Sequence, residues 1–236
     1  MEKNRINRFV QKYNLSGLIE SVKWDVEGTT LTTSFISDDK SVLGTVSTSE
    51  FDFEQGSYGV YDTTKFTKML SVLENDIDLS TIKVEGKTTS LNISDKGTSA
   101  TYMLADLSVI PVVPDLKAVP PMNVQITLDD DFTSKFIKSK GALSESDTFT
   151  FECKGGKGEI ILGYSSINTN RISMKVECKC DGDVSPISFS AKYLKEILNA
   201  NRGSKAASLQ ISSQGLANIQ FEKDNLTSKY YLVEIK

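Results

Sequence analysis

The sequence predicts an α+β protein made of two similar domains, each with antiparallel β-sheets and two short helices. Most of its 236 residues fall in short segments that alternate apolar and polar side chains or are rich in β-branched residues, with turns between them. The chain also repeats itself. Residues 61–70 and 189–198, about 128 positions apart, each place an aromatic residue and a capping residue before a short amphipathic helix. A fixed internal period indicates a repeated structural unit.

Two further pairs of segments support this repeat. Residues 102–104 (Tyr-Met-Leu) correspond to residues 230–232 (Tyr-Tyr-Leu) at the same offset. Residues 8–10 correspond to residues 135–137 at an offset of about 127. The repeated unit is then about 110 residues long, which is the size of a domain.

A proline-rich segment separates the two copies. Four of the five prolines lie in residues 111–121, which cannot join a central strand or a helix and therefore read as an extended connector. We predict a first domain at residues 1–110, an interdomain connector at 111–121 and a second domain at 122–236. The alternative is a loop inside one larger β domain.

Four helices are expected, each with apolar side chains at the three- and four-residue spacing of one helix face. They lie at residues 3–14, 63–73, 132–140 and 190–202. Asp62 and Ser190 are expected N-caps of the second and fourth helices, and residues 129–131 are expected to cap the third rather than to bind a metal. Gly141 and Gly203 follow the third and fourth helices as stop signals.

The expected strands fill the rest of each copy, and glycine-containing turns separate many of them. They lie at residues 29–36, 41–48, 81–85, 90–94, 99–105, 148–153, 159–163, 171–179, 207–212, 217–221 and 229–235. Residues 86–88 (Gly-Lys-Thr) resemble the end of a P-loop, but position 81 is threonine where that motif requires glycine. We therefore expect a turn between two strands there.

The composition excludes several kinds of chemistry. The chain has no histidine, so Ser-His-Asp and Cys-His mechanisms are impossible and the commonest general base is absent. Its three cysteines suit a reducing cytosol. Cys178 and Cys180 share a face of an expected strand, but without a second cysteine pair we expect packed or surface thiols rather than a zinc site. No catalytic residue, metal or cofactor is predicted.

The sequence contains no membrane or export signal that we recognise. It has no apolar run long enough for a transmembrane helix, and residues 1–6 lack the apolar region of a signal peptide. We therefore expect a cytoplasmic protein without a membrane partner, located in an infected bacterial host if the protein is viral.

Charge is distributed unevenly along the chain. The net charge of −4 argues against a general nucleic-acid binder. However, the four expected helices carry 12 Lys or Arg and one acidic residue, against 15 basic and 30 acidic residues elsewhere. On each helix the cations lie on a different stripe from the apolar residues, which predicts a shared cationic surface. Ordinary solvated lysines are the alternative. The predicted DNA-binding residues are Arg5, Arg8, Lys12, Lys65, Lys68, Lys135, Lys138, Lys140, Lys192, Lys195 and Arg202.

These features together resemble the sliding clamps of DNA polymerases. Residues 189–198 (Phe-Ser-Ala-Lys-Tyr-Leu-Lys-Glu-Ile-Leu) are similar to the second-domain helix of the archaeal and eukaryotic clamps, and residues 230–232 resemble their C-terminal strand. The compact length and residues 61–79 look closest to the clamps of T4-like bacteriophages. The chain departs from the cellular clamps in ending soon after Leu232.

The resemblance implies a processivity factor rather than an enzyme. Three chains would close into a homotrimeric ring of six similar domains, with an edge strand at residues 99–107 pairing with one at 171–179 of the next chain. The basic helices would face double-stranded DNA and contact its phosphates without reading sequence. The implied partners are a replicative DNA polymerase and an ATP-dependent clamp loader. By position, the pocket for a partner peptide comprises Ile36, Val42, Leu43, Val112, Val113, Tyr231 and Leu232.

Two alternatives remain open at this stage. One is a non-encircling polymerase accessory protein that grips DNA by charge, which would require a more basic chain. The other is a β-rich virion structural protein, which would explain the strands but not the cations on paired helices.

Overall fold

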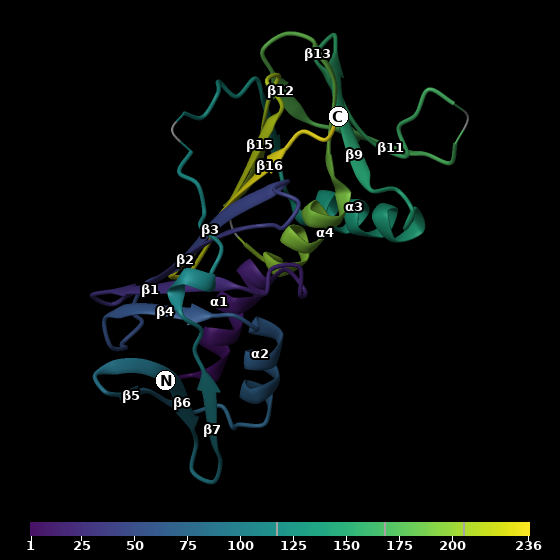
Figure 1. Cartoon of the computed structure of the whole chain (residues 1–236). Coiled ribbons are helices and arrows are strands. Elements are labelled where there is room, and N and C mark those ends of the chain that lie inside the picture. Colours follow the sequence, from purple (N-terminus) through teal and green to yellow (C-terminus); the bar gives the residue numbers. More distant parts are fainter. Residues whose placement is uncertain (117, 168, 205) are drawn as a thin grey trace. The chain divides into compact units, whose positions relative to one another are not determined.

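The computed structural model describes residues 1–116, 118–167, 169–204 and 206–236 (Figure 1). The chain forms two compact units. The first unit comprises Met1–Ile36, Gly44–Val113 and Asn225–Thr227. The second unit comprises Ser37–Leu43, Pro114–Asp224 and Ser228–Lys236. The fold class is α+β, as predicted, with antiparallel sheets and a pair of α-helices in each unit.

The helices follow the amphipathic pattern of the sequence. They are α1 (Lys3–Asn14), α2 (Thr63–Ser71), α3 (Asp130–Ala142) and α4 (Ala191–Ala200), with a short 3-10 helix at Leu107–Val109. The predicted bounds of α1 are confirmed. The prediction for α3 was too short, because the helix begins directly after its N-cap Asp129, and Gly141 lies inside its last turn instead of ending it.

The first unit holds two sheets. One has the strand order β3-β2-β1-β4 and the other β5-β6-β7. Their bounds are β1 (Val22–Glu27), β2 (Thr30–Ile36), β3 (Val42–Thr48), β4 (Gly56–Val60), β5 (Asp78–Val84), β6 (Lys87–Ser94) and β7 (Ser99–Met103). Glu85 and Gly86 turn the chain between β5 and β6 with φ angles of 51° and 80°. The expected turn is confirmed.

The second unit repeats this arrangement. Its sheets have the orders β11-β10-β9-β13 and β12-β8-β14-β15-β16. The strands are β8 (Val124–Thr127), β9 (Thr148–Lys154), β10 (Lys157–Leu162), β11 (Ile172–Val176), β12 (Cys178–Cys180), β13 (Val184–Ser190), β14 (Ala206–Ser212), β15 (Leu216–Lys223) and β16 (Leu226–Val233). The order β11-β10-β9-β13 therefore matches β3-β2-β1-β4, and β14-β15-β16 matches β5-β6-β7.

Several strands differ from the sequence expectation. β1, β4, β8 and β13 were not predicted. The single strand expected at residues 171–179 is two strands, because the chain leaves β11 at Glu177 and continues as β12 in the other sheet of the second unit. Residues 111–116 and 118–123 carry no regular secondary structure, and Lys117 lies outside the described residues.

Aromatic side chains form the core of each unit. In the first, the indole of Trp24 meets Phe9 and Phe66 edge-on and donates a hydrogen bond from Nε1 to the Tyr13 hydroxyl at 3.2 Å. In the second, Phe149 packs against Phe136 of α3 and Phe189 of β13.

The segments that carried the repeat supply core residues in both units. The paired positions are Phe9 and Phe136, Phe66 and Leu194, and Tyr102 and Tyr230, and all six side chains are buried. No α-helix in the described part of the chain is long and apolar enough to cross a membrane.

Candidate nucleic-acid interface

The helices α1 and α2 lie side by side in the first unit (Figure 1). Their apolar faces are buried through Ile6, Phe9, Phe66 and Leu70. Asp62 caps α2 by accepting a hydrogen bond from the Lys65 amide at 2.7 Å, and its backbone is held by the Tyr102 hydroxyl. Because the apolar side of α2 is buried, Lys65 and Lys68 project from its other side and are exposed.

The basic side chains of α1 are less exposed to solvent than the sequence predicted. Arg5 is half-buried, and its guanidinium contacts the Glu50 carboxylate at 3.1 Å and the Glu50 carbonyl. Arg8 is also half-buried. Lys12 is only 4% exposed, which contradicts its expected place on an open cationic face. It stands three positions after Phe9 and directly before Tyr13, so its methylene stem borders the apolar stripe and is covered with it.

The second unit carries the corresponding pair α3 and α4, which also pack together. Lys138 and Lys192 are exposed, and so is Arg202 just beyond α4. Lys135 is 64% exposed and contacts Asp131 one turn earlier at 2.6 Å. The hydrogen bond and the charge of Asp131 raise the pKa of Lys135 above its ordinary value. Lys195 is half-buried beside Glu196, at 3.2 Å.

Lys140 is the second departure from the expected cationic face. Its side chain is nearly buried, and its Nζ donates a hydrogen bond to the Ser144 carbonyl at 2.6 Å. Ser144 lies just beyond the C-cap Leu143, and a positive charge in the last turn of a helix interacts favourably with the helix dipole. Lys140 therefore closes the end of α3 instead of reaching outward.

The predicted DNA-binding set thus divides by exposure. Six side chains project into solvent and two are buried, with the other three between these classes. The exposed ones are Lys65, Lys68, Lys135, Lys138, Lys192 and Arg202. Exposed ammonium and guanidinium groups on helices attract phosphates without distinguishing bases. Contact with DNA stays a prediction for each of them.

The predicted peptide pocket draws on both units. Ile36, Val112 and Val113 belong to the first and Val42, Leu43, Tyr231 and Leu232 to the second. Val42, Tyr231 and Leu232 are buried, whereas Val112 is 90% exposed. The pocket therefore stays a prediction.

The loop at Ser37–Leu43 is ordered within the second unit. The Asp39 carboxylate accepts hydrogen bonds from the Ser37 hydroxyl at 2.6 Å and from the Ser41 amide at 3.0 Å. Partial burial alone would raise the pKa of Asp39, but these donors outweigh it and the pKa lies below its usual value. The Val233 amide donates to the Ser41 carbonyl at 2.9 Å, which fixes the loop against the end of β16.

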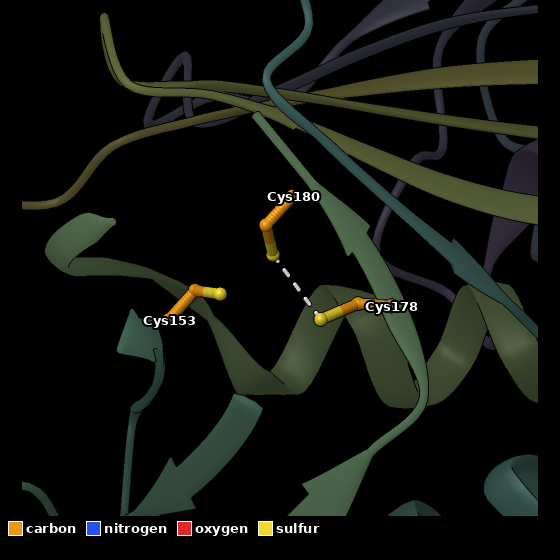
Figure 2. Close-up of side chains that lie close together, drawn as sticks. All are labelled: Cys153, Cys178 and Cys180. Atoms are coloured by element: carbon orange, nitrogen blue, oxygen red, sulfur yellow. Dashed lines mark hydrogen bonds between the residues drawn. The ribbon is translucent and has the colours of Figure 1, made fainter. Parts of the chain in front are cut away.

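One cluster was missed by reasoning from the sequence. Cys153 of β9 joins Cys178 and Cys180 of β12, so that the three sulfur atoms lie within 4.8 Å of one another (Figure 2). The pair at Cys178 and Cys180 was recognised from its spacing. The third member could not be found from spacing, because strand pairing and sheet packing bring Cys153 to them.

The helix pairs and antiparallel sheets of the two units define the fold of the PCNA-type sliding clamps. The whole chain is similar to the crystal structure of Proliferating Cellular Nuclear Antigen from Entamoeba histolytica, with a TM-score of 0.74 and 18% identity, and covers 96% of that chain. It is likewise similar over its whole length to PCNA from A. fulgidus in a structure with the C-terminal region of FEN-1 bound. That match has a TM-score of 0.72 and 15% identity and covers 97% of the neighbour. No protein-family model and no curated protein sequence matches the chain.

Proposed function

We propose that the protein is a sliding clamp, in which three chains form a ring around duplex DNA and tether a replicative polymerase. The observation that carries the proposal is the clamp fold over the full chain, with exposed cations on α2 of the first unit and on α3 and α4 of the second. No catalytic residue, metal or cofactor is needed for this role. We place the clamp with the T4-like phage proteins on the sequence resemblance alone.

The charge distribution supports this role physically. Lysines on flexible stems attract phosphates with no preferred register, so the ring can move along the duplex. Nearly all acidic residues lie outside the predicted helices, so the surfaces away from the helices carry the acidic excess and oppose DNA binding there. Retention comes from encirclement, and a polymerase held by the ring meets its template at an effective concentration of about millimolar.

Ring closure would use the free edges of two sheets. β7 ends the sheet β5-β6-β7, and β11 ends the sheet β11-β10-β9-β13. The Asp95 amide donates to the Thr98 carbonyl and the Leu104 amide to the Thr89 carbonyl, both at 2.9 Å. Antiparallel pairs alternate, so the amide of Thr101 on β7 points away from β6. Pairing β7 with β11 of the next chain would satisfy such amides.

Partner proteins complete the proposed role. An ATP-dependent clamp loader opens the ring, and the polymerase binds through a peptide at the predicted pocket. A region of FEN-1 bound to PCNA in the A. fulgidus structure supports peptide binding as a property to test here.

A pair of charge reversals tests the DNA-facing assignment. Lys68→Glu with Lys138→Glu changes one exposed helix cation in each unit. We expect the trimer to persist and primer extension on circular template, with cognate polymerase and loader, to fall roughly tenfold because phosphate attraction becomes repulsion. The matched control is Lys96→Glu with Lys157→Glu, which makes the same charge change in the exposed turn between β6 and β7 and at the exposed first residue of β10. Equal stimulation by the helix variant and the control would reject the assignment.

The oligomeric state separates the proposal from its alternatives. Three chains of 26.0 kDa give a mass of about 78 kDa by light scattering. A stable 26.0 kDa species that still stimulates the polymerase would favour a non-encircling accessory protein. Large assemblies without stimulation would favour a virion component.

A further inference from the structure

The three cysteines join the two sheets of the second unit. Cys153 lies on β9, in the sheet β11-β10-β9-β13, whereas Cys178 and Cys180 lie on β12 at the edge of the other sheet. Figure 2 shows their sulfur atoms directed toward a common point. The Sγ atoms of Cys178 and Cys180 are 3.2 Å apart, and all three lie within 4.8 Å of one another.

The neighbouring strand leaves room for this cluster. Gly158 of β10 pairs with Cys153 in register. A Cβ atom added at Gly158 would lie 2.5 Å from the Cys178 Sγ, so any other residue there would displace the sulfur. Cys153 is fully buried, while Cys178 and Cys180 are half-buried and leave one side of the cluster open to water.

We propose that Cys153, Cys178 and Cys180 bind one Zn²⁺ ion through their thiolates, with water as the fourth ligand. Thiolates are soft ligands, and soft ligands favour zinc over hard cations. Tetrahedral bonds of about 2.3 Å place sulfur atoms about 3.8 Å apart, so the observed cluster needs shifts of only a few tenths of an ångström to about 1 Å. Binding forms three Zn–S bonds and releases the thiol protons to solvent.

The ligand set determines which kind of ion is bound. The chain has no histidine, and among the described residues no carboxylate joins the three sulfur atoms. Hard cations such as Mg²⁺ and Ca²⁺ take oxygen ligands and are therefore excluded. Three thiolates and one divalent ion carry a net charge of −1. Water can hydrate this charge from the open side of the site.

A disulfide between Cys178 and Cys180 is the competing outcome. Forming that bond requires a two-electron oxidant, whereas zinc binding requires only the loss of thiol protons. Cys153 is also close enough to be an alternative disulfide partner for either cysteine, since the three thiols lie in one cluster. Zinc uses all three, whereas a disulfide leaves one unused.

Zinc binding would have a local structural effect. β12 follows β11 after only Glu177, so an ion bound to Cys153 and β12 fixes the point where the chain passes from one sheet to the other. The inference does not depend on the proposed clamp function, because it uses only contacts within the second unit.

The test is a metal titration of the full-length, fully reduced protein after removal of bound metal. We expect one Zn²⁺ per chain by competition with a chromophoric chelator. With Co²⁺ as the probe, we expect absorption bands from thiolate-to-metal charge transfer. We also expect all three thiols to become protected from alkylation when Zn²⁺ is present.

Two variants make this test specific. Cys180→Ser changes a half-buried ligand and should weaken Zn²⁺ binding at least about 100-fold. Glu152→Gln changes the residue next to Cys153, whose carboxylate instead contacts Lys154, and should bind as the wild type does. Circular dichroism checks that both variants fold, and Cys178→Ser replaces Cys180→Ser if the latter does not.

Three results would overturn the inference. They are the absence of saturable binding at micromolar Zn²⁺, unchanged affinity in the cysteine variant, and a purified protein that holds a Cys178–Cys180 disulfide and binds zinc only after that bond has been removed by non-physiological reduction.

Discussion

Asp95 shows how much one side chain organises in the turn between β6 and β7. Its carboxylate accepts hydrogen bonds from the amides of Glu74, Gly97 and Thr98 at 2.7, 2.8 and 2.6 Å. The amide of Glu74, followed by that of Gly97, holds the pKa of Asp95 below its usual value. These donors favour the ionised form, so the turn is most stable while Asp95 is charged.

This arrangement predicts a pH dependence of stability. Because the folded pKa of Asp95 is lowered, its contribution is present above the unfolded value of 3.8 and is lost as pH falls through the folded pKa. Asp95→Asn should therefore reduce the free energy of unfolding at pH 6, and the difference from wild type should shrink toward pH 3. Urea denaturation at a series of pH values measures this, and a difference that is constant with pH would contradict it.

Lysines illustrate what residue-level reasoning from sequence can and cannot reach. The exposure of Lys65, Lys68 and Lys138 could be predicted, because they lie well away from the apolar stripe of each helix. The burial of Lys12 and Lys140 could not, since a long stem can follow the apolar surface or turn back to a carbonyl. The destination of the charged end depends on neighbours that periodicity does not reveal.

Among the elements, the helices were easier to predict than the strands. Apolar spacing and capping residues define each helix locally, whereas strands depend on their neighbours. β4 contains Gly59, which weakens a strand prediction, yet a Cβ there would lie 2.4 Å from the Ala105 carbonyl oxygen. β13 contains Pro186, which the strand accommodates beside a register shift between Val184 and Ile187. The close approach of Ala105 therefore requires glycine at position 59, and Pro186 lies at an irregular point of β13, so each residue hides a strand from the sequence pattern.

The capping of α3 leads to a prediction at this scale. The Asp129 carboxylate accepts a hydrogen bond from the Phe132 amide at 2.7 Å, which satisfies one of the free amides at the helix start. Asp129→Ala should lower the free energy of unfolding by about 1 kcal/mol. Asp129→Asn keeps an acceptor and is the matched control, with stability near that of wild type. Chemical denaturation followed by circular dichroism measures both, and equal loss in the two variants would show that charge, not capping, is responsible.

At the scale of the whole molecule, the repeat could be read from the sequence because its anchors are core residues. Phe9 and Phe136, like Tyr102 and Tyr230, are buried in equivalent elements of the two units. Outside these anchor residues the two copies share few identical residues, yet both units have the same strand order. Many different sequences can bury the same positions and so give the same fold. The cysteine cluster was beyond the same reasoning, since its members meet across two sheets.

The proposed assembly can be tested at the free edge of β7. The amide of Thr101 points away from β6, so Thr101→Pro removes no hydrogen bond within the sheet β5-β6-β7. We expect the variant to keep its fold but to shift from trimer to monomer, measured by light scattering across a concentration series. Thr101→Val keeps the amide and should remain trimeric. A proline variant that assembles as well as the valine control would exclude β7 as the joining edge.

The environment of Trp24 has an experimental consequence. It is the only tryptophan in the chain and lies fully buried among aromatic rings of the first unit. Intrinsic fluorescence excited at the indole therefore monitors that half alone, whereas far-ultraviolet dichroism averages over both. Comparing the two signals during denaturation reveals whether the halves melt together or in sequence, without attaching any dye.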